Sequence, residues 1–309
     1  GSIFFWVRKL KEKSIISYYS PVGPVCGIKM INDESALVSV GNDGFVRVWE
    51  INFQENSCSS LQLIGENQVK KYERNMTSFS GIRCITASEK DSYLFIGDEN
   101  GSLFQINKLN LKVLNELKDN NVSVNCIASH ASLPIIATGG GDGFIRTYNI
   151  LSNNIALSMS KEITDTPITC LAFTDISIIV ASSEKLKFCR LPNLSCDIFA
   201  EYTGKSPFNS LSYASKAHLV FAACQDMSLY AFDTNNGKLF RVYNLSYSYF
   251  PIKAIIHQSG LIIAAAMSDG QVALIDTMSG EIIFSFQTFS GITTDIAFHD
   301  NGLFVSSFS

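Results

Sequence analysis

The chain has 309 residues, of which 46% are hydrophobic and 17% are charged, and its formal net charge at pH 7 is −4. This composition excludes an intrinsically disordered chain, which would combine low hydrophobicity with a high net charge. It also provides no overall basic field to hold nucleic acid or anionic lipid. Its longest apolar runs, such as Leu261–Met267, are far shorter than the ~18 residues of a membrane-spanning helix. We therefore expect a soluble protein with no membrane insertion and no direct binding to nucleic acid.

The eight cysteines include no C-x-x-C pair, so neither a zinc knuckle nor a thioredoxin-like site is predicted. Free buried thiols are typical of a reducing compartment, which predicts an intracellular protein of the cytoplasm or the nucleus. Gly1 and Ser2 are typical of the remnant of a cleaved tag. We therefore interpret residues 1–309 as a single domain of a longer protein.

The predicted elements are short strands along the whole chain. Two runs, Ile3–Lys9 and Ser14–Tyr19, precede the first complete unit of a repeat. Each unit has an apolar stretch, a Gly/Asp turn and a second alternating stretch, which ends in an aromatic or aliphatic residue followed by an acid or amide. The clearest copies are Gly41–Glu50 and Gly140–Asn149. A repeat of this kind predicts stacked, equivalent structural units.

Two markers keep the same period. The aromatic or aliphatic position falls at residues 6, 49, 106, 148, 189, 232 and 275, with spacings of 43, 57, 42, 41, 43 and 43 residues. An apolar position near the start of each unit falls at Ile28, Ile85, Ile127, Leu171, Leu211, Ile255 and Ile296. The one long spacing predicts an insertion between units at Phe53–Ser80, and such loops often carry binding.

Each unit contains four short runs that are typical of strands. In the third unit these runs are Val124–His130, Ile135–Gly139, Phe144–Ile150 and Ala156–Ile163. A single four-stranded sheet of this size cannot bury both of its faces. Sheets that pack radially against their neighbours can, which favours a propeller.

Units of this length with four strands each resemble the WD40 family over essentially the whole chain. Trp49 is the one WD-type tryptophan, and the turn aspartate is kept at Asp43, Asp142, Asp226 and Asp269. The resemblance implies an all-β fold, a seven-bladed β-propeller of four-stranded antiparallel blades.

The two ends of the chain supply complementary halves of a blade. Ile3–Lys9 and Ser14–Tyr19 resemble third and fourth strands, whereas Thr293–His299 and Leu303–Phe308 resemble first and second strands. We therefore predict that N- and C-terminal strands share the seventh blade, because this arrangement removes open sheet edges.

The resemblance implies a non-catalytic scaffold that binds partner proteins or peptides through its top face and rim loops. In this family the residue after the first apolar position of each unit lines the top of the central channel. By register these residues are Cys26, Arg83, Asn125, Thr169, Asn209, Lys253 and Thr294. The residues before the turn aspartate add Asn42, Gly141, Gln225 and Ser268, together with Glu99.

This predicted ring is polar and includes two cations, Arg83 and Lys253. Arginine pairs well with carboxylate and phosphate, so we predict an acidic or phosphorylated peptide as the ligand. The alternative is a water-filled channel mouth without a dedicated ligand. In the aromatic connection before Pro251, Tyr247, Tyr249 and Phe250 are predicted to form a hot spot for a partner on the rim.

No G-x-S-x-G, H-E-x-x-H or Walker sequence occurs. We therefore expect no enzymatic activity, no cofactor and no metal. One alternative is a quinoprotein-like propeller oxidoreductase, because Tyr230–Leu239 also resembles a repeat of that family. Another is a subunit of an RNA-processing or ribosome-assembly complex acting through protein contacts, and a place in some multi-protein complex is expected in any case.

Some reactive residue types recur at equivalent repeat positions. Because the positions are equivalent, we predict that these residues have structural roles, in packing between blades or at the ends of strands, rather than roles in ligand binding. They are Cys84, Cys126 and Cys170 on the one hand, and His130, His257 and His299 on the other.

Overall fold

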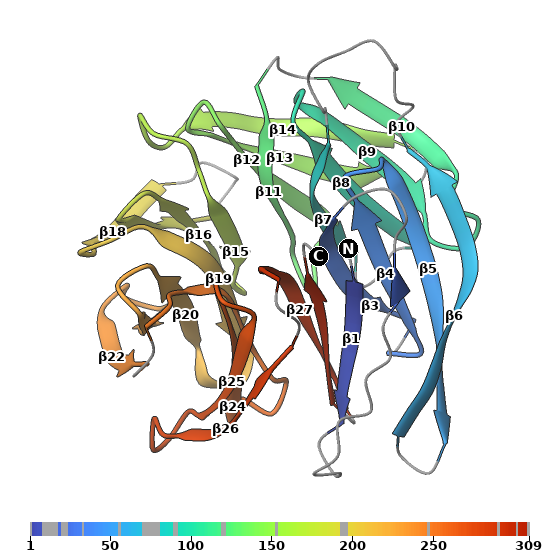
Figure 1. Cartoon of the computed structure of the whole chain (residues 1–309). Helices are drawn as coiled ribbons and strands as arrows, with labels where there is room; N and C mark the ends of the chain where they lie inside the picture. Colours follow the sequence, from blue (N-terminus) through green and yellow to red (C-terminus); the bar gives the residue numbers. More distant parts are fainter. Residues whose placement is uncertain are drawn as a thin grey trace.

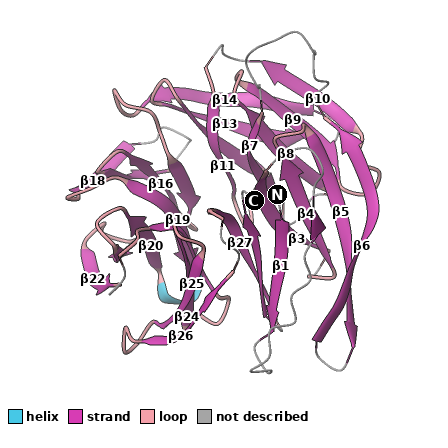
Figure 2. Ribbon diagram, in the orientation of Figure 1, coloured by secondary structure: helices cyan, strands magenta, loops and turns pink. Residues whose placement is uncertain are grey.

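The computed structural model describes residues 2–7, 18–19, 24–32, 34–54, 57–69, 81–88, 92–118, 122–151, 154–191, 197–245, 248–288, 291–300 and 302–307. Within them the chain forms β-strands β1 to β28 and a short 3-10 helix at Ser215–Ala217 (Figure 2). The strands form seven four-stranded antiparallel sheets, arranged around a central axis as the blades of a propeller (Figure 1). No helix in this part of the chain is long and apolar enough to cross a membrane.

Each of the first six blades is a meander of four consecutive strands. Blades one to three are β3 (Val25–Ile31), β4 (Ala36–Gly41), β5 (Phe45–Gln54) and β6 (Ser57–Gln68); β7 (Ile82–Ala87), β8 (Tyr93–Asp98), β9 (Ser102–Asn107) and β10 (Val113–Lys118); and β11 (Val124–Ser129), β12 (Ile135–Gly140), β13 (Phe144–Leu151) and β14 (Asn154–Glu162).

Blades four to six repeat the same order. They are β15 (Cys170–Phe173), β16 (Ser177–Ser182), β17 (Lys185–Arg190) and β18 (Asp197–Thr203); β19 (Phe208–Ala214), β20 (Leu219–Cys224), β21 (Ser228–Asp233) and β22 (Leu239–Asn244); and β23 (Pro251–Ile256), β24 (Ile262–Met267), β25 (Gln271–Asp276) and β26 (Ile282–Gln287). The first strands of neighbouring blades contact one another around the ring, so they form its inner wall.

The seventh blade combines the two ends of the chain, as predicted. From the inside outwards its strands are β27 (Thr293–His299), β28 (Gly302–Ser307), β1 (Ser2–Val7) and β2 (Tyr18–Tyr19). Strand β1 pairs with β28 along its whole length, from Ser2 opposite Ser307 to Val7 opposite Gly302. The rest of the predicted strand Ser14–Tyr19 lies outside the described residues.

Part of the predicted insertion at Phe53–Ser80 belongs to blade one. Strand β6 continues the pairing with β5 as far as Gln54 opposite Ser57, which makes this outer hairpin longer than the others. Residues 55–56 and 70–80 of the predicted insertion lie outside the described part of the chain.

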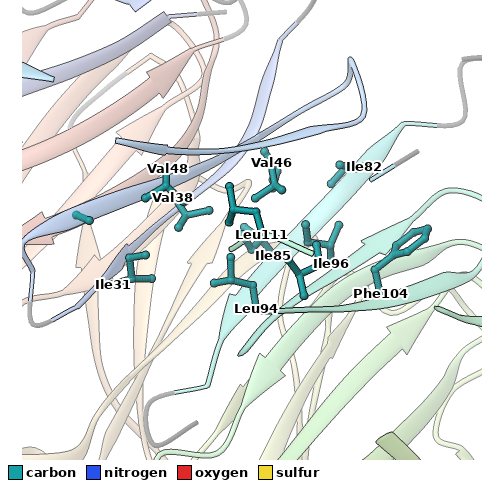
Figure 3. Close-up of a cluster of buried hydrophobic side chains, with 13 residues drawn as sticks. Ile31, Val38, Val46, Val48, Ile82, Ile85, Leu94, Ile96, Phe104 and Leu111 are labelled. Carbon is teal, nitrogen blue, oxygen red and sulfur yellow. The ribbon is translucent and has the colours of Figure 1, made fainter. Parts of the chain in front are cut away.

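The core lies between the blades. Side chains of β3, β4 and β5, such as Val38 and Val46, pack against Ile85, Leu94 and Ile96 of the second blade (Figure 3). The second strands are buried on both faces, which explains why they are wholly apolar or small rather than alternating. Full burial of each Val, Leu or Ile side chain contributes about 1.5–3 kcal/mol as an upper estimate.

The repeated Gly-Asp-Gly turn has a structural cause. In blade three, Asp142 accepts a hydrogen bond from the Phe144 amide at 3.2 Å, and its other oxygen lies 2.7 Å from the Arg146 guanidinium. Gly143 has a φ of +78°, and a Cβ there would lie 1.9 Å from the Thr164 carbonyl oxygen. The turn therefore requires glycine at this position.

We predict that closure of the seventh blade contributes strongly to stability. Phe5 of β1 is only 2% exposed, and its ring centroid lies 4.4 Å from that of Phe304 on β28. The Phe5→Ala variant should lower the free energy of unfolding by about 3–5 kcal/mol, because it leaves a cavity at this joint. Chemical denaturation would measure the loss.

Phe240→Ala is the matched control, because Phe240 lies on the outer strand β22 and is 64% exposed. This variant should change stability by no more than about 0.5 kcal/mol. Equal stability of the two variants would contradict a contribution from closure.

Candidate functional site

The inner strands of all seven blades enclose a central channel with a cavity of about 420 Å³. The sequence predicts one channel residue from each repeat unit, the residue that follows the first apolar position. All seven of these residues line the cavity. They are Cys26, Arg83, Asn125, Thr169, Asn209, Lys253 and Thr294. We call the end of the channel at which the first strands begin the channel entrance.

The second predicted set, the residues that precede the turn aspartate together with Glu99, lies at this entrance but does not line the cavity. Each has a backbone N–H that donates a hydrogen bond to the carbonyl of the connection that leads into the first strand of its own blade. The pairs are Asn42 to Pro24, Glu99 to Gly81, Gly141 to Ser123, Gln225 to Pro207 and Ser268 to Phe250, at 2.9–3.2 Å. This repeated bond places Glu99 in register with the other four.

Three of the predicted channel residues connect neighbouring blades. Each side chain donates a hydrogen bond to a backbone carbonyl at, or just before, the start of the next inner strand. The bonds run from Asn125 Nδ2 to Ile168 (3.0 Å), from Thr169 Oγ1 to Phe208 (3.0 Å) and from Asn209 Nδ2 to Pro251 (2.9 Å). These hydrogen bonds connect blade three to four, four to five and five to six, so the three side chains help to stabilise the ring.

The backbone pairing shifts blade six by one residue from the register expected from the sequence. Lys253 pairs with Ala266 after a β-bulge, as Gly27 pairs with Val40 in blade one. Ala254 therefore occupies the place of Ile28, and the assignment of Ile255 to that place is wrong. Hydrophobicity alone could not distinguish them, since blade six has apolar residues on both sides of Lys253.

The shift places Lys253 in a different layer of the channel, one residue further from the entrance. The members of this layer all pair with the penultimate residue of the second strand of their blade. They are Gly27, Cys84, Cys126, Cys170, Ser210, Lys253 and Asp295.

Within this layer, Lys253 and Asp295 of neighbouring blades form an ion pair. Lys253 Nζ lies 3.2 Å from Asp295 Oδ1, and the Asp295 side chain is only 8% exposed. Asp295 also accepts hydrogen bonds at 3.0 Å from the backbone amides of Ile28 and Ile296. The Asp295 carboxylate is the main cause that raises the pKa of Lys253, although burial alone would lower it.

A second lysine, Lys29 of β3, also lines the cavity. No described residue forms a hydrogen bond or an ion pair with its ammonium group. Burial, and next the charge of Lys253, lower its pKa, whereas Asp295 opposes this effect. Lys29 and Asp295 were not among the predicted site residues. The signal that could have identified them is a charged residue within an otherwise apolar or small first strand.

Arg83 and Glu99 form an exposed ion pair at the channel entrance. Arg83 Nη2 lies 3.1 Å from Glu99 Oε1, and the arginine side chain is 46% exposed. The exposed side chains of Tyr249 and Phe250 lie at the same end, because the Phe250 carbonyl accepts the Ser268 turn amide. Tyr247 lies outside the described residues.

The equivalent cysteines pack against neighbouring backbone. The Cys84 thiol donates to the Val124 carbonyl of the next blade at 3.5 Å. Burial raises the pKa of Cys84 and of Cys170 to about 12, so both remain protonated and unreactive at neutral pH. In the described part of the chain, no three His, Cys, Asp or Glu side chains are grouped so as to hold a metal ion.

The equivalent histidines lie at the turns after first strands. His130 is buried, and its Nδ1 accepts hydrogen bonds from the amides of Ser132 and Leu133. His257 Nδ1 accepts the amide of Ser259 in the same way. These contacts indicate a structural role in shaping the turn.

The architecture defines a seven-bladed β-propeller with a polar central channel. Residues 111–149, which span β10, β11, β12 and most of β13, match the family model for the WD domain, G-beta repeat, of the WD40 family. The chain is a WD40-repeat β-propeller.

Similar proteins carry the same kind of repeat. The chain is 24% identical over 299 residues to WD repeat-containing protein 62 of Sus scrofa, a match that covers 85% of this chain and 19% of the relative. The corresponding protein of Mus musculus is 23% identical, over 80% of this chain and 17% of the relative. A guanine nucleotide-binding protein subunit beta-like protein of Encephalitozoon cuniculi is 28% identical, over 42% of this chain and 40% of that protein.

The chain therefore spans less than a fifth of the length of these two WD repeat-containing relatives. WD40-repeat proteins are generally non-catalytic scaffolds. The fold and the relatives accordingly support a general role in protein interaction.

We predict that Lys29 opposes folding at neutral pH. Its pKa in the folded state lies below its ordinary value of 10.5, so the unfolded chain binds the proton more readily. The Lys29→Met variant should be more stable than the wild type near pH 7 by more than about 0.5 kcal/mol. This advantage should shrink as the pH rises from the lowered folded-state pKa of Lys29 towards 10.5, because the folded chain loses the proton first, and it should disappear above 10.5, where both states are neutral.

Denaturation at pH 7 and at pH 11 would measure the difference. Lys161→Met is the control, because Lys161 is 41% exposed and lies on the outer strand β14. An advantage of Lys29→Met that stayed constant with pH would indicate a hydrophobic gain instead of removal of a charge.

We also predict energetic coupling between Lys253 and Asp295. Lys253→Met should destabilise the fold, because Asp295 would remain as a buried carboxylate without its cation. In a double-mutant cycle with Asp295→Asn, the double variant should recover about 0.5–3 kcal/mol relative to the sum of the single losses. Strict additivity, measured by chemical denaturation, would show that the pair contributes no interaction energy.

Proposed function

We propose that this propeller is a non-catalytic interaction platform that binds partner proteins or peptides through the channel entrance and the adjoining rim. One observation carries the proposal: an exposed arginine, Arg83, lies at the same end of the ring as exposed Tyr249 and Phe250. Arginine and aromatic side chains are the types that contribute most binding energy in protein interfaces.

The proposed ligand is an acidic or phosphorylated peptide. Glu99 pairs with Arg83 in an exposed setting, where such a pair contributes at most about 1 kcal/mol. A ligand carboxylate or phosphate can therefore replace Glu99 at small cost and form a two-pronged contact with the guanidinium. Asn125, Thr169 and Asn209 are less suited to this task, because their side chains already join neighbouring blades.

The proposal includes a place in a larger multi-protein assembly. It draws on the relatives, which are much longer than this chain and are named as WD repeat proteins. Their names give no support to the quinoprotein or RNA-processing alternatives.

The test is a quantitative comparison of partners captured from a cell extract by the wild type and by Arg83→Glu. Arg83 is exposed, so the substitution should leave the melting temperature nearly unchanged. We expect that a subset of captured proteins decreases at least tenfold with Arg83→Glu, and that phosphatase treatment of the extract removes those that bind through phosphate. Lys253 is left intact, because a carboxylate at that position would face Asp295.

Lys161→Glu is the matched control. Lys161 has an exposure similar to that of Arg83, and it also pairs with an acid, Asp197, but it lies on an outer strand. Losses specific to Arg83→Glu would support the channel entrance as the binding surface. Identical partner sets for the wild type and both variants would contradict the proposal.

A further inference from the structure

The wall of the channel carries an excess of positive charge on three consecutive blades. Lys253 of blade six, Asp295 of blade seven and Lys29 of blade one all line the cavity. The Asp295 carboxylate already accepts one ammonium group and two backbone amides. The two lysines therefore share a single carboxylate as counter-charge, and the Lys29 ammonium group has no partner among the described residues.

Two serines of blade five add hydroxyl donors to the same cavity. Ser210 Oγ accepts the Ala254 amide at 2.8 Å, and Ser212 Oγ accepts the Ile256 amide at 3.1 Å. A hydroxyl group that accepts a backbone N–H still has its own proton to donate. Both serines line the cavity, and no described acceptor takes either proton.

The cavity has room for an anion that keeps part of its hydration. Its volume is about 420 Å³, whereas each water molecule occupies about 30 Å³ in the liquid. An anion in this space would meet ammonium and hydroxyl groups without losing all of its water. This lowers the desolvation cost that limits charge binding in protein interiors.

We propose that the channel binds an oxyanion, a phosphate or carboxylate group, beside Lys29 and Lys253, with the hydroxyl groups of Ser210 and Ser212 as additional donors. The group neutralises the excess positive charge and gives Lys29 the partner that the fold lacks. This site is independent of the proposed function, because a free anion can occupy it without any partner protein. A free phosphate and a phosphorylated side chain that enters the channel present the same chemistry.

The test uses inorganic phosphate as the probe. The melting temperature of the wild type is measured in millimolar phosphate and in sodium chloride of equal ionic strength. We expect phosphate to raise it by about 1–3 °C relative to chloride, because a ligand that binds only the folded state stabilises it. Lys29→Met should lose this response, whereas Lys29→Arg, which keeps the charge, should retain most of it.

Lys161→Met controls for general effects of removing a lysine, because Lys161 lies outside the channel. It should respond to phosphate as the wild type does. An equal rise for the wild type and Lys29→Met, or no rise for the wild type, would overturn the proposal. Arg83 lines the same cavity, so its neutral variant Arg83→Gln tests the entrance separately. A phosphate response that is lost with Arg83→Gln but kept with Lys29→Met would place the anion at the entrance and overturn the proposal.

A phosphoserine peptide distinguishes the two sources of the oxyanion. Stabilisation by this peptide that Lys29→Met abolishes would assign the site to a side chain of a partner. A phosphate response that depends on Lys29, without a peptide response, would assign the site to a free anion. Either result supports the oxyanion site.

Discussion

The burial of both faces of every blade is the constraint on which the whole structure depends. A short four-stranded sheet with wholly apolar second strands, such as β4 and β24, is stable only between two neighbours. Each interface, like the cluster between blades one and two in Figure 3, needs a blade on either side. The ring must therefore close, and the pairing of β1 with β28 supplies the last interface.

Ring closure also gives the molecule its functional geometry. It brings the first strands together as the wall of one channel, so that one residue from each blade forms a layer. Blades three to six are joined near the entrance by neutral hydrogen bonds from Asn125, Thr169 and Asn209. The charged residues of the channel instead lie on blades six, seven, one and two, as Lys253, Asp295, Lys29 and Arg83. In one part of the ring, neutral side chains form hydrogen bonds with the neighbouring blade. In the other part, the charged side chains include Lys29, whose ammonium group has no partner among the described residues.

The sequence was sufficient to predict the fold because the period repeats across the entire chain. The shared seventh blade followed from strands that were missing at one end and present at the other. The channel was predicted only in part. In blade six, Ile252, Ala254 and Ile255 are all apolar, so the pattern did not show which of them corresponds to Ile28, and Lys253 was assigned to the wrong layer by one residue. Lys29 was missed because the prediction took one position from each unit, and Lys29 lies three residues after that position, Cys26, on the same inner strand.

The Asp295 contacts lie at the seam where the chain ends meet. Its carboxylate accepts the Ile28 amide of blade one and faces Lys253 of blade six, so it spans both neighbours of the composite blade. The same carboxylate thus sets the charge of the channel and joins the inner strand of blade seven to blade one. Loss of this carboxylate would therefore alter both the charge of the channel and the contact between blade seven and blade one.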